Sequence, residues 1–299
     1  MEESVASSVG NPASVDCPTC GQPSPSPSVQ VRPVATTQPV YAVGQLSPQF
    51  PSIGVEKEFA QLTAGAHQGD RIEVGLLQQQ LANPDNAYLA RHLCWVFASS
   101  GVDAFTVLPR DDTEITRLVE VLSPEAPGDP VHVVIGRTIS NADDSPCAAS
   151  GLPAVRADQV LAFTPAEFAA AMPEDASDGD DAGASPAPGS PEFQAVVRGV
   201  FARLTRGAGN RGFGDEHRAR NYVALRYPPI YHAVRQAQRD GKVLVGIDAQ
   251  HSHAADRRLV SVRLTVRHQR TDITERYQCL VDVTEVFPFL ITGLQPIYD

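Results

Sequence analysis

The stretch from Gly241 to Glu285 constrains the fold most, because its apolar and polar residues alternate strictly. From residue 259 to residue 267 (LVSVRLTVR) valine and leucine alternate with serine, arginine and threonine, and residues 277–283 (YQCLVDV) repeat the pattern. A period of two residues is typical of a half-buried antiparallel strand. The polar residues 269–272 between the two runs predict a hairpin turn, and Val243–Ile247 predicts an earlier strand. The chain therefore ends in an antiparallel meander.

The rest of the chain predicts an α+β fold, with a two-layer α/β body ahead of this C-terminal antiparallel meander. Strands are expected over residues 39–44, 103–108 and 131–137, and helices over residues 54–64, 83–100, 111–122, 164–172 and 193–204. The helix over 83–100 would be capped by Gly101 and would bury Cys94 and Trp95. A last long helix begins at Asp215, and Pro228-Pro229 must kink or split it before Gly241 ends it.

Two segments lack the pattern of a folded chain. Residues 1–39 are a Ser/Pro-rich stretch without periodicity, and we predict that they form a disordered tail. Residues 173–192 combine acidic residues with Gly, Ala, Pro and Ser, and we predict a disordered acidic loop within a domain that spans residues 40–299. The length of that loop leaves a two-domain alternative open.

Charge and hydropathy limit the partners. The net charge is −11, and six acidic residues of the 173–192 loop account for about half of it. We see no broad basic field, so we expect no nucleic-acid partner. No run of eighteen apolar residues exists, so we expect no membrane-spanning helix, and the Met-Glu-Glu start lacks the regions of a secretory signal. These features predict a cytoplasmic protein.

The five cysteines do not suggest a disulfide framework, and we expect reduced thiols. Cys147 lies in a polar loop and is expected to be exposed, whereas Cys279 falls on the apolar face of its strand and is expected in the core. Cys17-Pro-Thr-Cys20-Gly has the form of a zinc-knuckle turn, which supplies half of a tetrahedral site. Two unbound thiols in the tail are the alternative.

A glycine-rich segment, Gly207–Gly214 (GAGNRGFG), precedes the last long helix. A phosphate cradle was considered, but the segment follows a helix and lacks the Gly-Lys-Ser/Thr of a phosphate-binding loop, so a flexible turn is favoured. Basic residues line the other faces of the following helix. A solvated face is the simplest interpretation, and a peptide carboxylate partner is the alternative. These residues are Arg218, Arg220, Arg226, Arg235 and Arg239.

Several stretches taken in order resemble a known family. They are the VYAVG run of residues 40–44, the RARNYVA run of residues 218–224 and the DVTEVFP run of residues 282–288. Together they resemble the C-terminal domain of the cyanobactin maturation protease PatG, shared with PatA, and the similarity covers roughly residues 40–299. The resemblance implies a part in making ribosomally produced, modified peptides, as an accessory domain to which no catalytic activity is assigned.

The resemblance also implies a metal site. Members of that family tend to carry cysteines just before the first strand and again in the turn before the long hairpin. Cys17 and Cys20 match the first place, and His251 and His253 occupy the second. Thiolate and imidazole are common ligands of structural zinc, and residues two apart on a strand project from the same face. We therefore hypothesise that these four residues bind zinc, with the histidines as plain loop residues as the alternative.

The sequence favours a non-catalytic accessory or binding domain that contacts a precursor peptide or a partner enzyme. We assign no catalytic and no cofactor-binding residue, and a homodimer stays open. The alternative is a peptide-modifying enzyme that uses zinc or a cysteine, with Cys147 or Cys279 as nucleophile, although no general base lies at motif spacing. No H-E-x-x-H pattern supports a catalytic metal.

Overall fold

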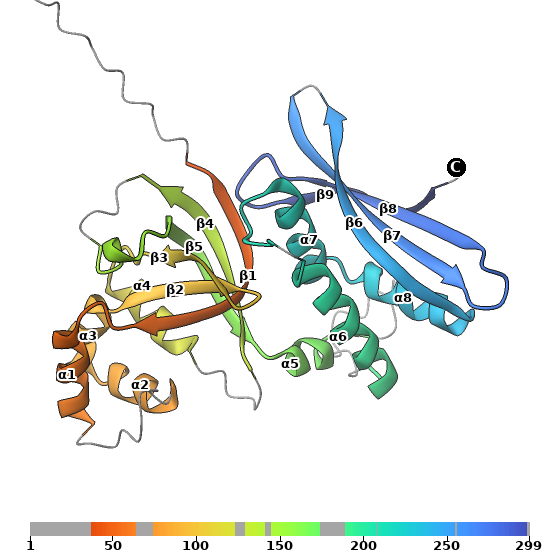
Figure 1. Ribbon diagram of the computed structural model, residues 1–299. Coiled ribbons are helices and arrows are strands. Elements are labelled where there is room, and N and C mark those ends of the chain that lie inside the picture. Colours follow the sequence, from red (N-terminus) through yellow and green to blue (C-terminus); the bar gives the residue numbers. More distant parts are fainter. Residues whose placement is uncertain are drawn as a thin grey trace, which may run out of the picture. The chain divides into compact units, whose positions relative to one another are not determined.

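The computed structural model describes residues 37–63, 74–122, 129–140, 145–173, 189–207, 209–254 and 256–297, without the side chains of residues 253 and 254 (Figure 1). Residues Thr36–Asp299 form one compact unit. The α+β prediction is confirmed: a five-stranded barrel comes first, and helices that cover a four-stranded antiparallel sheet follow.

The barrel has the strand order β1-β2-β3-β5-β4 and is closed. Its strands are β1 (Pro39–Gln49), β2 (Cys94–Ser99), β3 (Val102–Val107), β4 (Val131–Ile139) and β5 (Ala154–Phe163). Neighbours are antiparallel except β3 and β5, which pair in parallel over only Thr106↔Ala154 and Val107↔Val155. The barrel is therefore held shut along this seam by a very short ladder.

Short helices lie on one side of the barrel (Figure 1). They are α1 (Ile53–Leu62), α2 (Val74–Leu81), η1 (Pro84–Asn86), α3 (Ala87–His92) and α4 (Asp112–Glu120), while η2 (Ala148–Ser150) precedes β5. Their apolar faces share a core with the barrel strands, in which Trp95, Phe105 and Leu118 are almost fully buried. His132 of β4 joins these layers, because its Nδ1 accepts from the Leu46 amide and its Nε2 lies 2.8 Å from the Val121 carbonyl. Burial lowers its pKa.

The predicted helix over residues 83–100 is wrong. Helix α3 ends at His92, and residues 94–99 form β2. Ser100 and Gly101 both have positive φ, 51° and 78°, which is the two-residue hairpin turn that matches the twist of the flanking strands. A short apolar run cannot by itself distinguish a strand from a buried helix, and here pairing with β1 and β3 decides.

The α/β layering expected for the N-terminal half is also replaced, by the barrel. Strand β1 runs past Gly44, where we predicted a break, to Gln49. Gly44 is required there, since a Cβ atom would lie 2.2 Å from the Ala98 carbonyl oxygen.

The second half confirms the predicted meander. Strands β6 (Lys242–Ala254), β7 (Arg257–His268), β8 (Thr274–Asp282) and β9 (Phe289–Ile297) are antiparallel neighbours in chain order. The described helices before the sheet are α5 (Pro165–Ala170), α6 (Pro191–Thr205), α7 (Asp215–Arg226) and α8 (Pro229–Arg239). The alternating residues Val260, Val262, Leu264 and Val266 are buried in the core that the sheet shares with α6, α7 and α8. The predicted split at Pro228-Pro229 is confirmed.

Arg218 of α7 is the centre of a buried junction. Its side chain has no exposed surface and donates to the carbonyl oxygens of Val283 at 2.6 Å, of Val286 at 3.3 Å and of Glu285. Burial, with the nearby Arg258, lowers its pKa to about 10, and the Asp215 carboxylate lies 3.6 Å away. Arg218 therefore does not belong to the solvated arginine face that the sequence predicted.

Asn221, one turn further along α7, ties the same helix to the barrel. Its Nδ2 donates to the Tyr41 carbonyl at 2.8 Å, and its Oδ1 accepts from Asn210 at 2.8 Å. The glycine-rich segment completes the joint, because the Tyr41 amide donates to the Gly212 carbonyl. A Cβ on Gly212 would lie 2.6 Å from Ala42, and its φ is 76°. The segment is a tight connector against β1, which corrects the expectation of a flexible turn.

We expect Arg218→Met to lower the free energy of unfolding by about 3 kcal/mol, because it leaves buried carbonyl groups without a donor. Urea denaturation followed by circular dichroism measures the loss. Arg270→Met on the exposed β7–β8 turn is the matched control and should leave stability within about 0.5 kcal/mol of the wild type. Equal stability of the two variants would contradict the conclusion that the buried contacts of Arg218 stabilise the fold.

Candidate functional site

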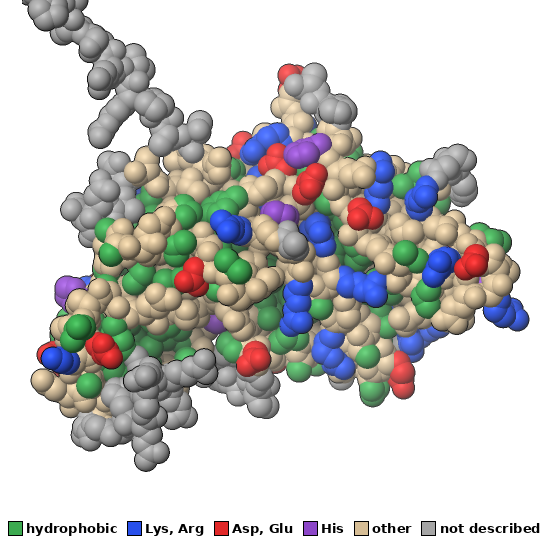
Figure 2. Space-filling view, in the orientation of Figure 1, with side chains coloured by type: hydrophobic (Ala, Val, Ile, Leu, Met, Phe, Trp, Pro, Cys, Tyr) green, Lys and Arg blue, Asp and Glu red, His purple; other side chains and the backbone are tan. Residues whose placement is uncertain are grey.

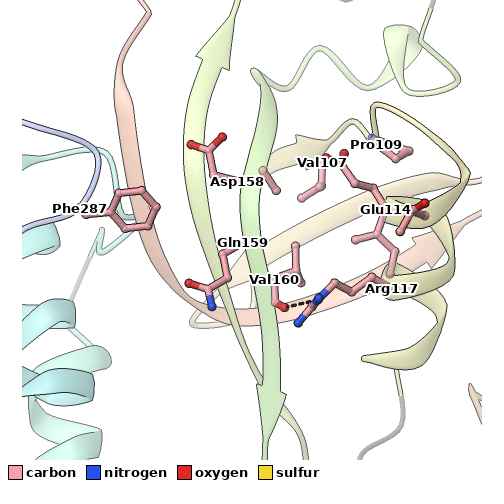
Figure 3. A pocket seen from close by; sticks show the side chains of 11 residues that line it. Val107, Pro109, Glu114, Arg117, Asp158, Gln159, Val160 and Phe287 are labelled. Carbon is pink, nitrogen blue, oxygen red and sulfur yellow. Dashed lines mark hydrogen bonds between the residues drawn. The ribbon is translucent and has the colours of Figure 1, made fainter.

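The barrel seam leaves one side of β5 without a partner strand. Pairing with β3 stops at Val155, whereas β5 continues to Phe163 with only β4 beside it. Helix α4 lies across this gap instead of a strand. A cavity of about 370 Å³ opens between α4 and residues 157–160 of β5 (Figure 3). We call it the seam cavity.

The seam cavity has an apolar base and a charged rim. Val107, Leu118, Ala157 and Val160 form the base. Glu114 and Arg117 of α4 lie on one side of β5 in Figure 3, and Phe287 of the β8–β9 loop lies on the other. Phe287 is 54% exposed although it is a large aromatic residue. A volume of this size suits a short ligand segment or one or two side chains.

Two arginines occupy the position that a neighbouring strand would take. Arg110 donates to the Ala157 carbonyl at 3.3 Å and to the Asp158 carboxylate at 2.6 Å. Arg117 donates to the Val160 carbonyl at 3.4 Å. The ion pair of Arg110 with Asp158 is partly exposed, and exposed pairs contribute little stability. An extended segment could therefore displace these side chains and pair with β5, which is the strand-addition mode of peptide binding.

The chemistry of the seam cavity suits binding. The described residues that line it include no cysteine, histidine or lysine, and the side chains there that could serve as nucleophile or general base are those of Thr113, Glu114 and Asp158. The sequence did not indicate this site, since α4 and β5 meet only when the barrel closes.

The predicted zinc ligands are only partly described. Cys17 and Cys20 lie outside the described residues. His251 and His253 are in β6, opposite Val260 and Arg258, rather than in a loop. The two histidines are two residues apart in the sequence. In the described part of the chain, no three His, Cys, Asp or Glu side chains cluster as metal ligands. The zinc hypothesis stays a prediction.

The prediction of reduced thiols is wrong for two cysteines. Cys94, the first residue of β2, forms a disulfide with Cys147, and Cys147 is buried rather than exposed. Cys279 is free and buried, and burial raises the pKa of its thiol to about 12. A sulfur atom in a disulfide and a protonated buried thiol are both poor nucleophiles. Neither cysteine fits the role that the enzyme alternative requires.

Comparison with known proteins follows the same two halves. A family model described as "PatG Domain" matches residues 39–162, which hold the barrel except its last residue, and one described as "PatG C-terminal" matches residues 189–297, which hold α6, α7, α8 and the sheet. The chain belongs to the PatG family. The predicted resemblance is thereby confirmed.

A solved structure titled "PatG Domain of Unknown Function" has the same fold. It is similar with a TM-score of 0.63 and 18% identity, over 87% of this chain and 98% of that one. No curated protein matches the chain. Among the described residues of this PatG-family chain, no helix has the length and apolar character to span a membrane.

We expect Cys94 and Cys147 to resist iodoacetamide in denaturant until a reductant is added. The disulfide closes a loop of 53 residues, so its reduction should lower the free energy of unfolding by about 4 kcal/mol. Peptide mapping identifies the modified thiols, and urea titrations with and without reductant measure stability. Cys94→Ser should lose the same stability without reductant. Alkylation of both cysteines in unreduced protein would contradict the disulfide.

Proposed function

We propose that this PatG-family chain is a non-catalytic accessory domain that holds an extended polypeptide segment at the seam cavity. The observation that carries the proposal is the unpaired side of β5 beside that cavity. A bound segment would extend the barrel sheet at β5, and one of its side chains would enter the cavity between α4 and Phe287. Its main chain would replace the arginine contacts to the carbonyls of Ala157 and Val160.

The setting we propose is the biosynthesis of ribosomally made, modified peptides of the cyanobactin kind. Membership of the PatG family supports this setting. The segment would come from a precursor peptide or from a partner protease or modifying enzyme. Main-chain pairing tolerates many sequences, because it reads backbone groups and uses alternate side chains for selectivity. Such tolerance suits a domain that serves variable peptides.

The proposal includes a cytoplasmic location, because precursor peptides are made there. The cytoplasm is a reducing compartment, and the disulfide between Cys94 and Cys147 counts against that location. Burial of Cys147 favours persistence of the bond, since reduction requires access of a thiolate to sulfur.

Filling the seam cavity should abolish peptide binding. Thr113 is exposed on α4 and lines the cavity, so Thr113→Trp places a large ring over β5. We expect at least a tenfold loss of affinity, about 1.4 kcal/mol, for a peptide selected on the wild-type protein from a random phage-displayed library. Titration calorimetry measures the affinity.

Thr116→Trp makes the same change on the same helix, at a residue that lines a different pocket, and should leave binding unchanged. Hydrogen exchange should show protection of β5 amides by the peptide in the wild type. A selected peptide that binds Thr113→Trp as tightly as the wild type would reject the seam cavity as its site.

The proposal also retains a structural zinc ion held by Cys17, Cys20, His251 and His253. The spacing of the two histidines in the sequence supports it, because residues two apart on a strand project from the same face. Elemental analysis of purified protein should find one zinc per chain, and Cys17→Ser should lose most of it. Peptide affinity at the seam cavity should not follow zinc content. Wild-type protein purified without chelator and free of metal would reject the zinc site and leave the seam proposal standing.

A further inference from the structure

Positive charge is concentrated in the second half of the chain. Residues 189–297 hold 16 of the 24 Lys and Arg residues but only 10 of the 35 Asp and Glu residues, so a chain of net charge −11 contains a half with an excess of about six positive charges. Figure 2 shows basic side chains gathered over the region of α6, α7 and α8. The net charge of the whole chain conceals this surface.

Two grooves with apolar bases flank α6. One, of about 570 Å³, lies between α6, α8 and the start of β6, and its base includes Val196, Val234 and Leu244. The other, of about 940 Å³, lies between α6 and the barrel, and its base includes Val43 and Phe201. We call them the sheet groove and the barrel groove. Both are large enough for side chains of a polypeptide.

Arginines form the rims of both grooves. Arg203 and Arg235 line the sheet groove, and Arg198 and Arg206 line the barrel groove. Arg203 is held in place by its bond to the Leu244 carbonyl at 2.8 Å. Arg198 and Arg206 are exposed and form no ion pair with a described carboxylate. Each groove has one acidic lining residue, Glu192 and Asp129 respectively, so the rims are net positive.

The two grooves meet at Gly199, which lines both. Gly199 is exposed in the middle of α6, where glycine costs about 1 kcal/mol relative to alanine. Packing within the chain does not require it, because a Cβ built there meets nothing within 4 Å. Because Gly199 has no side chain, nothing at this position of α6 separates the two grooves, and a bound segment could pass from one to the other.

We propose that an acidic segment of a polypeptide partner crosses α6 at Gly199. Its apolar side chains would enter the sheet and barrel grooves, and its carboxylates would pair with Arg198, Arg203 and Arg206. A planar guanidinium group can form two parallel hydrogen bonds to one carboxylate, so these arginines suit Asp and Glu side chains. The apolar groove bases favour an amphipathic polypeptide over a nucleic-acid backbone, whose phosphates need no such base. This surface is separate from the seam cavity and does not depend on its function.

The test measures binding of a short fluorescein-labelled peptide of alternating glutamate and leucine to the full chain by fluorescence anisotropy. Matched peptides carry glutamine or lysine in place of glutamate. We expect the acidic peptide to bind, the lysine peptide not to bind, and the affinity to fall with salt. Charge reversal by Arg198→Glu with Arg206→Glu should weaken binding at least tenfold.

The control is Lys57→Glu with Arg270→Glu, which changes net charge equally at exposed positions outside both grooves and should bind as the wild type. Gly199→Gln separates folding from binding. It should raise the thermal stability of the protein but lower its affinity for the acidic peptide, because the new side chain blocks the crossing between the grooves. Thr113→Trp should leave the affinity for this acidic peptide unchanged. Failure of the present proposal can therefore be distinguished from failure of the proposal for the seam cavity. The proposal would be overturned if the acidic peptide did not bind, or if the control variant lost as much affinity for it as Arg198→Glu with Arg206→Glu. It would also be overturned if duplex DNA bound as tightly as the acidic peptide.

Discussion

The buried guanidinium of Arg218 is the interaction on which the rest of the structure depends. A charge without exposed surface needs hydrogen-bond acceptors, and here backbone carbonyls of residues 283, 285 and 286 accept from both terminal nitrogens of the guanidinium, while its Nε has no partner among the described residues. Asn221 joins the same helix to β1 through the Tyr41 carbonyl. The three stretches that carry the family resemblance, in β1, in α7 and after β8, therefore meet at one joint. They define how the barrel and the sheet are assembled, which explains why they identify the family without indicating an activity.

Two of the open strand edges in the described part of the chain, those of β9 and β5, differ in what covers them. Strand β9 is the last of its sheet and exposes Phe289 and Ile291, which would make it a candidate for pairing with another chain. Two of its amides are already occupied, because Leu290 donates to the Tyr222 hydroxyl at 3.2 Å and Leu294 donates to the Tyr227 hydroxyl at 2.7 Å. Tyr222 belongs to α7, Tyr227 directly follows the last residue of that helix, and both are half-buried. On the open side of β5, in front of α4, the carbonyls of Ala157 and Val160 are occupied only by the side chains of Arg110 and Arg117, so a partner strand would displace two side chains there.

What could be predicted from the sequence follows the range of the interactions involved. Alternation in residues 259–283 and the proline pair at 228–229 are local signals, and both predictions are confirmed. Residues 94–99 were mistaken for helix because pairing with β1 and β3 decides their state. The disulfide joins residues 53 apart in sequence, and the seam cavity joins α4 to β5, so both exist only in the closed barrel. The arginine grooves were partly accessible, since counting charge separately for residues 189–297 would have shown the excess.

The Arg218 joint also shapes the seam cavity, although Arg218 does not line it. Arg218 binds the carbonyls of Glu285 and Val286, the two residues before Phe287. The position of Phe287 at the seam cavity is therefore set by a side chain of α7. The exposed pair of Glu285 with Arg137 of β4, at 3.8 Å, is too weakly held to do this alone. A segment that pairs with β5 and packs on Phe287 would therefore contact both family halves at once. The joint gives the chain a reason to keep barrel and sheet together: the barrel supplies the strand edge, and the sheet half supplies Phe287 to the lining of the seam cavity.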